Sequence, residues 1–150
     1  MLDNRRSRGW VLGLVLVLAS VLVGCGGTEG SGSAGASPDL DGSEWSLVKL
    51  QGANLLPGTN ITVSFAEGNA GGFAGCNSYG GPYEAAGDGA LSVSMLSATL
   101  MACLEPEGVM EQESAYLAAL QEAAAYRVTG GRLEIEDGGG KVLLVFVPLP

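Results

Sequence analysis

Apolar and polar residues alternate in short runs over most of the chain after residue 42, and glycine-rich turns separate these runs. The clearest run is 60–66, in which Ile61, Val63 and Phe65 would share one face of a strand. Alternation with a period of two between frequent turns is typical of antiparallel sheets and barrels. The pattern predicts strands at 44–50, 60–66, 71–76, 79–85, 91–95, 126–128, 132–136 and 141–147.

One segment follows the period of a helix instead. Residues 107–124 contain few turn residues, and they carry an apolar stripe made of Val109, Tyr116, Leu117, Leu120 and Ala124. The last expected strand, 141–147, is almost continuously apolar, which predicts a central strand buried on both faces. We therefore expect a β-dominated α+β domain at 42–150. It would be a compact antiparallel barrel-like or strongly curved sheet with one main helix packed across it.

The first 25 residues have the three zones of an export signal. Three arginines at positions 5, 6 and 8 form a basic start, and an uncharged stretch of fourteen residues follows at 10–23. The stretch ends in Leu22-Val23-Gly24-Cys25, which matches the lipobox of bacterial lipoproteins. Residues 1–24 are therefore predicted to be a lipoprotein signal peptide. By resemblance to that motif, Cys25 would carry the lipid, with fatty acids such as palmitate, and would become the new N-terminus.

The alternative interpretation is an uncleaved membrane helix, because 10–27 is eighteen uncharged residues long. Its Gly-Cys-Gly-Gly end and the lack of a following basic cluster favour the lipoprotein. Both interpretations place the rest of the chain outside the cytoplasmic membrane, either on its outer face or in a periplasm. Residues 26–41 are rich in Gly, Ser and Ala, so we expect them to form a flexible tether.

Charge and composition exclude several classes of function. After the signal peptide, four basic residues remain against fifteen acidic ones, a net charge of −11. Such a chain is a poor ligand for nucleic acid and for anionic lipid headgroups. The chain contains no histidine, which removes Ser-His-Asp and Cys-His catalysis and imidazole metal sites. We therefore expect a monomer that binds no cofactor and whose acidic side chains are solvated at the surface.

Two cysteines remain once Cys25 is assigned to the lipid. In an oxidising compartment Cys76 and Cys103 would most simply form a disulfide, worth roughly 3–4 kcal/mol in the chain-entropy model. Two buried free thiols are the alternative. A catalytic thiol is disfavoured because no histidine is available to activate it.

The order of the motifs resembles the META domain, also called the HslJ-like family. Gly75-Cys76-Asn77-Ser78-Tyr79, continued to Tyr83, is similar to the family's GCN-x-Y-x-G-x-Y segment, and Thr99-Leu100-Met101-Ala102-Cys103 to its T-x-M-A-C. The helix with Glu113 and Tyr116 and a terminal hairpin follow, and the resemblance covers roughly 43–147. It implies a barrel-like fold crossed by a helix. Members are often envelope lipoproteins, some linked to stress or motility, and no defined activity comes with the resemblance.

The motif residues also have a physical interpretation of their own. Gly75 would permit a close approach or a bulge, and Asn77 would bond backbone groups in a tight turn. Tyr79 and Tyr83 would share one face of a strand, and Thr99 would bond backbone before Cys103. These roles favour a scaffold held by a disulfide. The alternative is a ligand-contacting cluster of Gly75, Asn77, Tyr79, Tyr83, Thr99 and Met101, with a pocket between sheet and helix lined by tyrosines such as Tyr116.

Three hypotheses of function follow. The leading one is a membrane-tethered, non-catalytic module for binding or envelope maintenance, with an unidentified envelope protein or small molecule as its partner. The second is a cell-wall glycan enzyme that uses the carboxylates near the helix start, Glu105, Glu107, Glu111 and Glu113. The third is weak calcium binding by Asp88 and the acids of 134–137, although these residues lack EF-hand spacing.

Overall fold

The computed structural model describes residues 39–150. The predicted signal peptide, the lipobox with Cys25 and the tether up to residue 38 lie outside the described residues. Within 39–150, no helix is long and apolar enough to cross a membrane.

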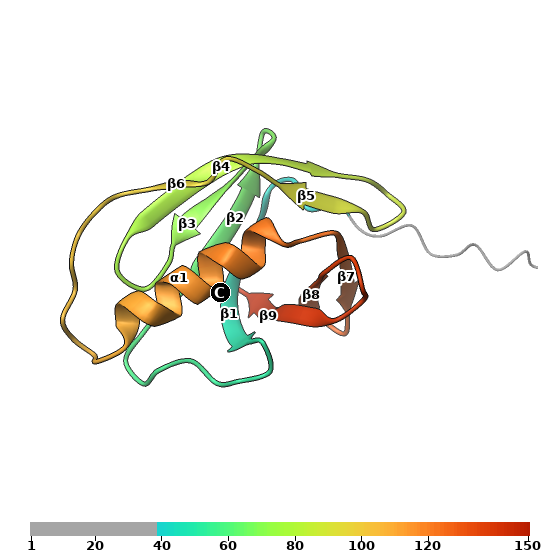
Figure 1. The fold of residues 1–150 in the computed structure, drawn as a ribbon. Coiled ribbons are helices and arrows are strands. Elements are labelled where there is room, and N and C mark those ends of the chain that lie inside the picture. The colour runs from blue at the N-terminus through green and yellow to red at the C-terminus, as the bar shows by residue number, and fades with distance from the viewer. Residues whose placement is uncertain (1–38) are drawn as a thin grey trace, which may run out of the picture. The chain divides into compact units, whose positions relative to one another are not determined.

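Nine strands form one strongly curved antiparallel sheet (Figure 1). The order of the sheet is β5-β4-β3-β2-β1-β9-β8-β7, and β6 pairs with β4 outside this path. Curvature brings the two ends of the path together, because Ala90 bridges to Ala125 and the Leu91 amide donates to the Ala124 carbonyl over 3.1 Å. The expected barrel-like sheet is therefore confirmed. The strands are β1 (Ser43–Leu50), β2 (Thr62–Ala66), β3 (Asn69–Phe73), β4 (Ser78–Ala85), β5 (Leu91–Val93), β6 (Ser97–Ala98), β7 (Ala125–Thr129), β8 (Arg132–Glu136) and β9 (Val142–Pro148).

The helix α1 (Val109–Gln121) lies across the concave face of this sheet and contacts β9 and β5 (Figure 1). It begins after Gly108, whose φ of 87° is in the left-handed region that favours glycine. The expected apolar stripe is present at Val109, Tyr116 and Leu120, which are buried. Ala124, expected on the same stripe, is exposed, because the helix ends three residues before it.

The hydrophobic core fills the space between α1 and the inward faces of the strands. Alternation decides which side chains enter it, as Val63 and Phe65 of β2 do, while Thr62 and Ser64 between them stay half-buried. The largest fully buried side chains are Tyr116, Phe65 and Phe146. Tyr116 packs edge-on against Phe146, with ring centroids 6.5 Å apart. The helix is thus held to the strand β9 at the centre of the sheet.

Besides shifts of one or two residues at strand ends, β3, β5 and β6 depart from the expected strands. The glycine-rich strand β3 begins at Asn69 and ends at Phe73, because residues 74–77 form a tight turn in which the Ala74 amide donates to the Asn77 carbonyl. β5 ends at Val93, and Met95, expected to continue it, has a φ of 49° and is 81% exposed. The two-residue strand β6 was not expected, since two residues carry no recognisable period.

The central strand β9 has the expected neighbours, β1 and β8, but it is not fully buried on both faces. Leu144 and Phe146 point into the core, whereas Val145 and Val147 are half-buried, because residues 39–150 form no second layer over the outer face of the sheet. Leu143 is buried as well. It lies at the irregularity where the register of β8 and β9 shifts, which interrupts the alternation.

The domain begins earlier than the expected boundary at residue 42. Leu40 is only 1% exposed and belongs to the hydrophobic core. Its carbonyl accepts from the Ser43 amide, and the Asp41 carboxylate accepts from the Glu67 amide over 2.7 Å. A single leucine in a Gly/Ser-rich segment gives no periodic signal, so sequence analysis placed it in the tether.

One close approach of strands predicts a glycine requirement. A Cβ added at Gly72 would lie 2.3 Å from the Thr62 carbonyl oxygen, whereas a Cβ at Gly80 would have Ala70 O as its nearest atom at 3.8 Å. Gly72→Ala should therefore lower the free energy of unfolding by about 2 kcal/mol or more, because backbone must move. Gly80→Ala, the matched control, should stay within about 0.5–1 kcal/mol of the parent protein. Urea unfolding measures both, and equal losses would contradict the prediction.

Candidate functional site

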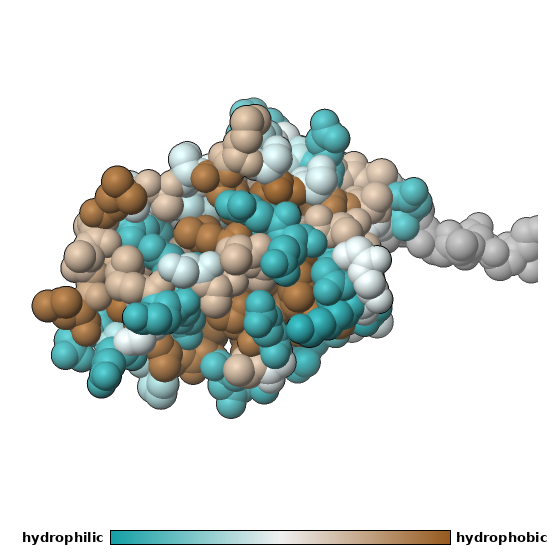
Figure 2. All heavy atoms as spheres, viewed as in Figure 1, coloured by the Kyte–Doolittle hydropathy of each residue, from teal (hydrophilic) through white to brown (hydrophobic). Residues whose placement is uncertain are grey.

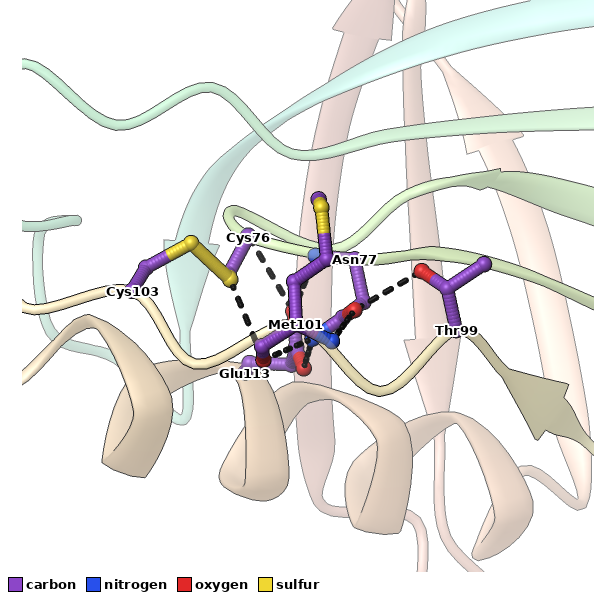
Figure 3. Close-up of a disulfide and its surroundings, with 6 residues drawn as sticks. All are labelled: Cys76, Asn77, Thr99, Met101, Cys103 and Glu113. Carbon is purple, nitrogen blue, oxygen red and sulfur yellow. Dashed lines mark hydrogen bonds between the residues drawn. A yellow bond between two sulfur atoms is a disulfide. The ribbon is translucent and has the colours of Figure 1, made fainter.

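The motif residues meet where the 74–77 turn, the segment after β6 and α1 come together (Figure 3). The turn depends on Gly75, whose φ of 112° is unfavourable for residues with a side chain. It leaves Cys76 and Asn77 buried, with each about 1% exposed. We call the cluster of Cys76, Asn77, Thr99, Met101 and Glu113 the Asn77 clamp.

The side chain of Asn77 makes four hydrogen bonds. Its Oδ1 accepts from the Thr99 hydroxyl over 2.7 Å and from the Met101 amide over 2.8 Å. Its Nδ2 donates to the Met101 carbonyl over 3.1 Å and to Glu113 Oε1 over 2.7 Å. These four bonds use both donors and both acceptor positions of the amide. Asn77 therefore joins three segments that are distant in sequence, rather than the single turn that sequence analysis expected.

Glu113 is the buried charged side chain of the clamp, at 5% exposure. Its Oε2 accepts from the Asn77 amide over 2.7 Å and from the Cys76 amide over 3.1 Å, while Oε1 accepts from the Asn77 side chain. Three N–H donors thus replace the water that a carboxylate loses on burial. The helix is anchored to the 74–77 turn by this carboxylate.

The disulfide expected between Cys76 and Cys103 is confirmed, with 5.9 Å between the two Cα atoms (Figure 3). It links the residue next to Asn77 with a residue two positions beyond Met101. The 99–103 segment is consequently fixed at both ends, by hydrogen bonds to Asn77 at one end and by a covalent bond at the other. Thr99 takes part through its side chain to Asn77 Oδ1, where sequence analysis expected a bond to backbone.

The tyrosines of the motif lie inside the domain. The hydroxyl oxygens of Tyr79 and Tyr116 are 2.5 Å apart, and the Tyr79 hydroxyl donates to the Thr62 carbonyl over 3.0 Å. A hydroxyl has one proton, so Tyr116 donates to Tyr79. Burial raises the pKa of both hydroxyls. Part of the space between sheet and helix, where the alternative interpretation placed a ligand pocket, is filled by these two rings, which pack edge-on with their centroids 5.5 Å apart.

Tyr83 shares the inward face of β4 with Tyr79, as the spacing predicts, and is 9% exposed. It packs edge-on against Phe65 with ring centroids 5.0 Å apart. Its hydroxyl donates to the Asp41 carboxylate over 3.3 Å, and burial followed by the charge of Asp41 raises the pKa of this hydroxyl. Tyr83 thus secures the first residues of the domain, not the clamp.

The four glutamates near the helix start do not converge. Glu113 points inward to the clamp, whereas Glu105, Glu107 and Glu111 are exposed. A glycan-cleaving pair needs an acid and a second carboxylate facing each other across the substrate. The one buried carboxylate of this set has its oxygens bonded to three protein N–H groups, so the arrangement gives no support to the enzyme hypothesis.

The acids considered for calcium have protein partners. Glu134 and Glu136 both form ion pairs with Arg127, the former over 2.6 Å. The Asp137 carboxylate accepts from the Lys141 and Gly139 amides in the β8–β9 turn, and these bonds lower its pKa. Asp88 accepts from the Ala90 amide in its own loop. Within residues 39–150, no group of three or more His, Cys, Asp or Glu side chains could hold a metal ion.

Sequence analysis missed the neighbour of Glu113. Gln112 accepts at Oε1 from the Leu56 amide over 2.7 Å and donates from Nε2 to the Thr59 hydroxyl over 3.0 Å. The helix therefore holds the loop between β1 and β2 with one residue and the 74–77 turn with the next. The sequence marks this part of the helix only through Glu113, a glutamate at a position where the helical spacing of the apolar stripe calls for an apolar residue.

The geometry defines a class of small disulfide-bonded domains in which a helix crosses a nearly closed antiparallel sheet and an internal polar cluster joins the two. The model of the META domain matches residues 38–148. The chain belongs to the META domain family.

The solved structures that are similar to the chain include two determined by NMR. A protein from Burkholderia xenovorans, solved by NMR, is 30% identical with a TM-score of 0.59, and the match covers 78% of this chain and 94% of that one. A second NMR structure is 22% identical with a TM-score of 0.57, covering 73% and 91% of the two chains, and it supports the fold alone. The comparison with curated proteins gave no match.

The first prediction from the site concerns Glu113. Glu113→Gln would place an NH₂ group against N–H donors, so the free energy of unfolding should fall by about 2–3 kcal/mol. Glu111→Gln, an exposed change on the same helix, should have an effect within about 0.5 kcal/mol. Urea unfolding of both oxidised variants gives the comparison. A Glu113→Gln protein as stable as the Glu111→Gln protein would show that the clamp contributes nothing to folding.

The second prediction from the site concerns alkaline pH. Above a pH of about 10 the unfolded chain loses tyrosine protons that buried Tyr79 and Tyr116 retain, so stability falls as pH rises. Each such tyrosine contributes a slope of up to about 1.4 kcal/mol per pH unit. Tyr116→Phe should cost about 1 kcal/mol at pH 8 and should unfold with a shallower slope between pH 10 and 12. Urea titrations across this range test it, and an unchanged slope would refute it.

Proposed function

We propose that this META-domain protein is an extracytoplasmic lipoprotein, held at a bacterial membrane through Cys25, whose domain is a non-catalytic binding or envelope-maintenance module. The observation that carries the proposal is the Asn77 clamp with its disulfide. The residues best suited to chemistry, Glu113 and Asn77, are buried and have their hydrogen-bonding atoms occupied by other protein groups. Such a cluster supports a scaffold rather than a reaction centre.

The disulfide also supports a location outside the cytoplasm. Structural disulfides persist in oxidising compartments and are rare in the cytosol of most bacteria. The lipobox at 22–25 independently indicates export followed by lipid attachment. Two separate features of the sequence, far apart in the chain, therefore favour the same compartment.

A recess on the outer face of β2, β3 and β4 is available to a ligand. It is an open groove of about 620 Å³ with mostly small or polar residues in its lining, which consists of Ser64, Ala66, Asn69, Ala70, Gly71, Gly80, Gly81, Pro82, Met95 and Ser97. It lies on the opposite face of the sheet from the buried tyrosines. A small envelope ligand would bind there rather than between sheet and helix.

The prediction for this function is lipid attachment at Cys25. Cells that express the full chain and are fed labelled palmitate should yield a labelled protein in the membrane fraction, and Cys25→Ala should abolish the label. The matched control is the Cys76→Ala/Cys103→Ala double variant, which removes the other two cysteines and should keep the label. An unlabelled parent chain, or a Cys25→Ala chain that is still labelled, would refute the anchor.

The binding part of the proposal is tested on the same membrane-purified protein. A rise in melting temperature with cell-wall fragments or envelope metabolites would identify a small ligand. No rise with any of them removes the small-ligand form of the proposal and leaves a protein partner. Hydrolysis of peptidoglycan by the parent protein that is lost in a Glu111→Gln variant would contradict the non-catalytic assignment.

A further inference from the structure

The segment that follows β6 presents large apolar side chains to solvent. Leu100 is 98% exposed, Leu104 is 84% exposed and Met101 is 56% exposed. In Figure 1 this segment forms the outer margin of the domain between β6 and the start of α1, and in Figure 2 hydrophobic spheres protrude from the same margin. Exposed apolar side chains grouped on one loop commonly mark a surface that contacts a membrane or another protein.

The loop is held rigidly, so its exposed side chains are not the result of a mobile segment. The amide and the carbonyl of Met101 are both hydrogen-bonded to the Asn77 side chain, and Cys103 is joined to Cys76 by the disulfide (Figure 3). The Thr99 amide, the amide and carbonyl of Met101 and the cystine are bonded to the domain, while the side chains of Leu100 and Leu104 are exposed to solvent. A loop whose backbone is already fixed loses little conformational entropy when its side chains become buried in a membrane or in a binding partner.

We propose that the 99–104 loop inserts its exposed apolar side chains into the lipid bilayer to which the chain is anchored. This inference rests on the proposed lipid anchor. The side chains that project are aliphatic or thioether groups, which suit hydrocarbon and offer no hydrogen bond to a protein partner. The chain carries no charged residue from Gly89 to Leu104, although its mature part has a net charge of −11. The first acids after the loop, Glu105 and Glu107, are exposed and can remain in water while the uncharged side chains of the loop enter uncharged lipid.

The length of chain before the domain permits this contact. Fifteen residue steps separate Cys25 from Leu40, which span at most about 50 Å when extended. A domain of this size has a radius of gyration of about 13 Å, so it is roughly 35 Å across. The anchor can therefore reach the bilayer while the margin of the domain formed by the loop also touches it. Anchoring raises the effective concentration of the loop at the membrane, so that even weak insertion is populated.

A second copy of the chain fits this surface less well. Leu100, Met101 and Leu104 together expose on the order of a few hundred Å². A stable dimer buries about 800 Å² on each partner. The side chains also protrude instead of lining a recess that a second copy would fill. A bilayer needs neither a large area nor a complementary shape.

The experiment uses a chain that does not depend on natural lipidation. Residues 26–150 carry a hexahistidine tag in place of residues 1–25 and are bound to phosphatidylcholine vesicles that contain a nickel-chelating lipid. The Burkholderia relative, 94% of whose chain is matched, is a folded protein of little more than this domain. A polarity-sensitive dye is attached at Ala102→Cys, an exposed position in the loop, and the matched control dye is attached at Arg132→Cys in the β7–β8 hairpin. Mass analysis of the disulfide-linked peptides confirms the Cys76–Cys103 pair in both.

Nitroxide groups on the lipid acyl chains should quench the Ala102 dye at least roughly threefold more than the Arg132 dye. Leu100→Ser/Leu104→Ser should bring quenching at Ala102 down to the level at Arg132, which shows that the leucines and not the dye drive insertion. Equal quenching at both positions in the parent loop overturns the inference. A change at Ala102 that depends on protein density and not on the acyl nitroxide indicates contact between copies, and it also overturns the inference.

Failure here and failure of the proposed function can be told apart. The tag holds the protein to the vesicle whether or not Cys25 is lipidated in cells. Loss of palmitate labelling would therefore remove the anchor without altering the quenching result. Equal quenching at Ala102 and Arg132 would remove the loop contact and leave the anchor in place.

Discussion

The hydrogen bonds around the Asn77 side chain are the interaction on which the rest of this domain depends. An amide with two donors and two acceptors, all satisfied, fixes the distances between a turn, an irregular segment and a helix at one point. These polar contacts add to the packing of α1 against the sheet, which involves chiefly β9 and β5. With Glu113 bonded to the same turn, the helix has one position along the concave face. The packing of Tyr116 against Tyr79 and Phe146 follows from that position.

Burying a carboxylate without a cationic partner strongly destabilises the folded state unless N–H donors surround the carboxylate. Here the Cys76 and Asn77 amides and the Asn77 side chain meet that need, and Gly75 gives the turn the backbone conformation that aims them at Glu113. The disulfide then limits how far the unfolded chain can separate the same segments. Gly75, Asn77, the cystine and Glu113 therefore act together, and the stabilising effect of each depends on the presence of the others.

The regular part of this fold could be predicted from the sequence because it depends on local period. Ile61, Val63 and Phe65 alternate, and the same alternation appears in the structure as buried positions. The cystine could be predicted because counting cysteines is independent of geometry. The role of Glu113 could not be predicted, since its partners lie 36 and 37 residues away. Leu40 and β6 were missed for the related reason that a single residue or a pair has no period, and only tertiary contacts decide their state.

The way the domain is joined to its preceding segment has a mechanical consequence. Residues 39–42 lead into β1, which is hydrogen-bonded to β2 on one side and to β9 on the other. Leu40 is embedded in the core just before this strand, and Gly42 is bonded to the Phe65 carbonyl. Tension applied through the N-terminal segment would therefore load a strand at the middle of the sheet and not an edge that can be peeled away. Pulling on the N-terminal end of this domain would therefore have to break the hydrogen bonds of an internal strand on both of its sides.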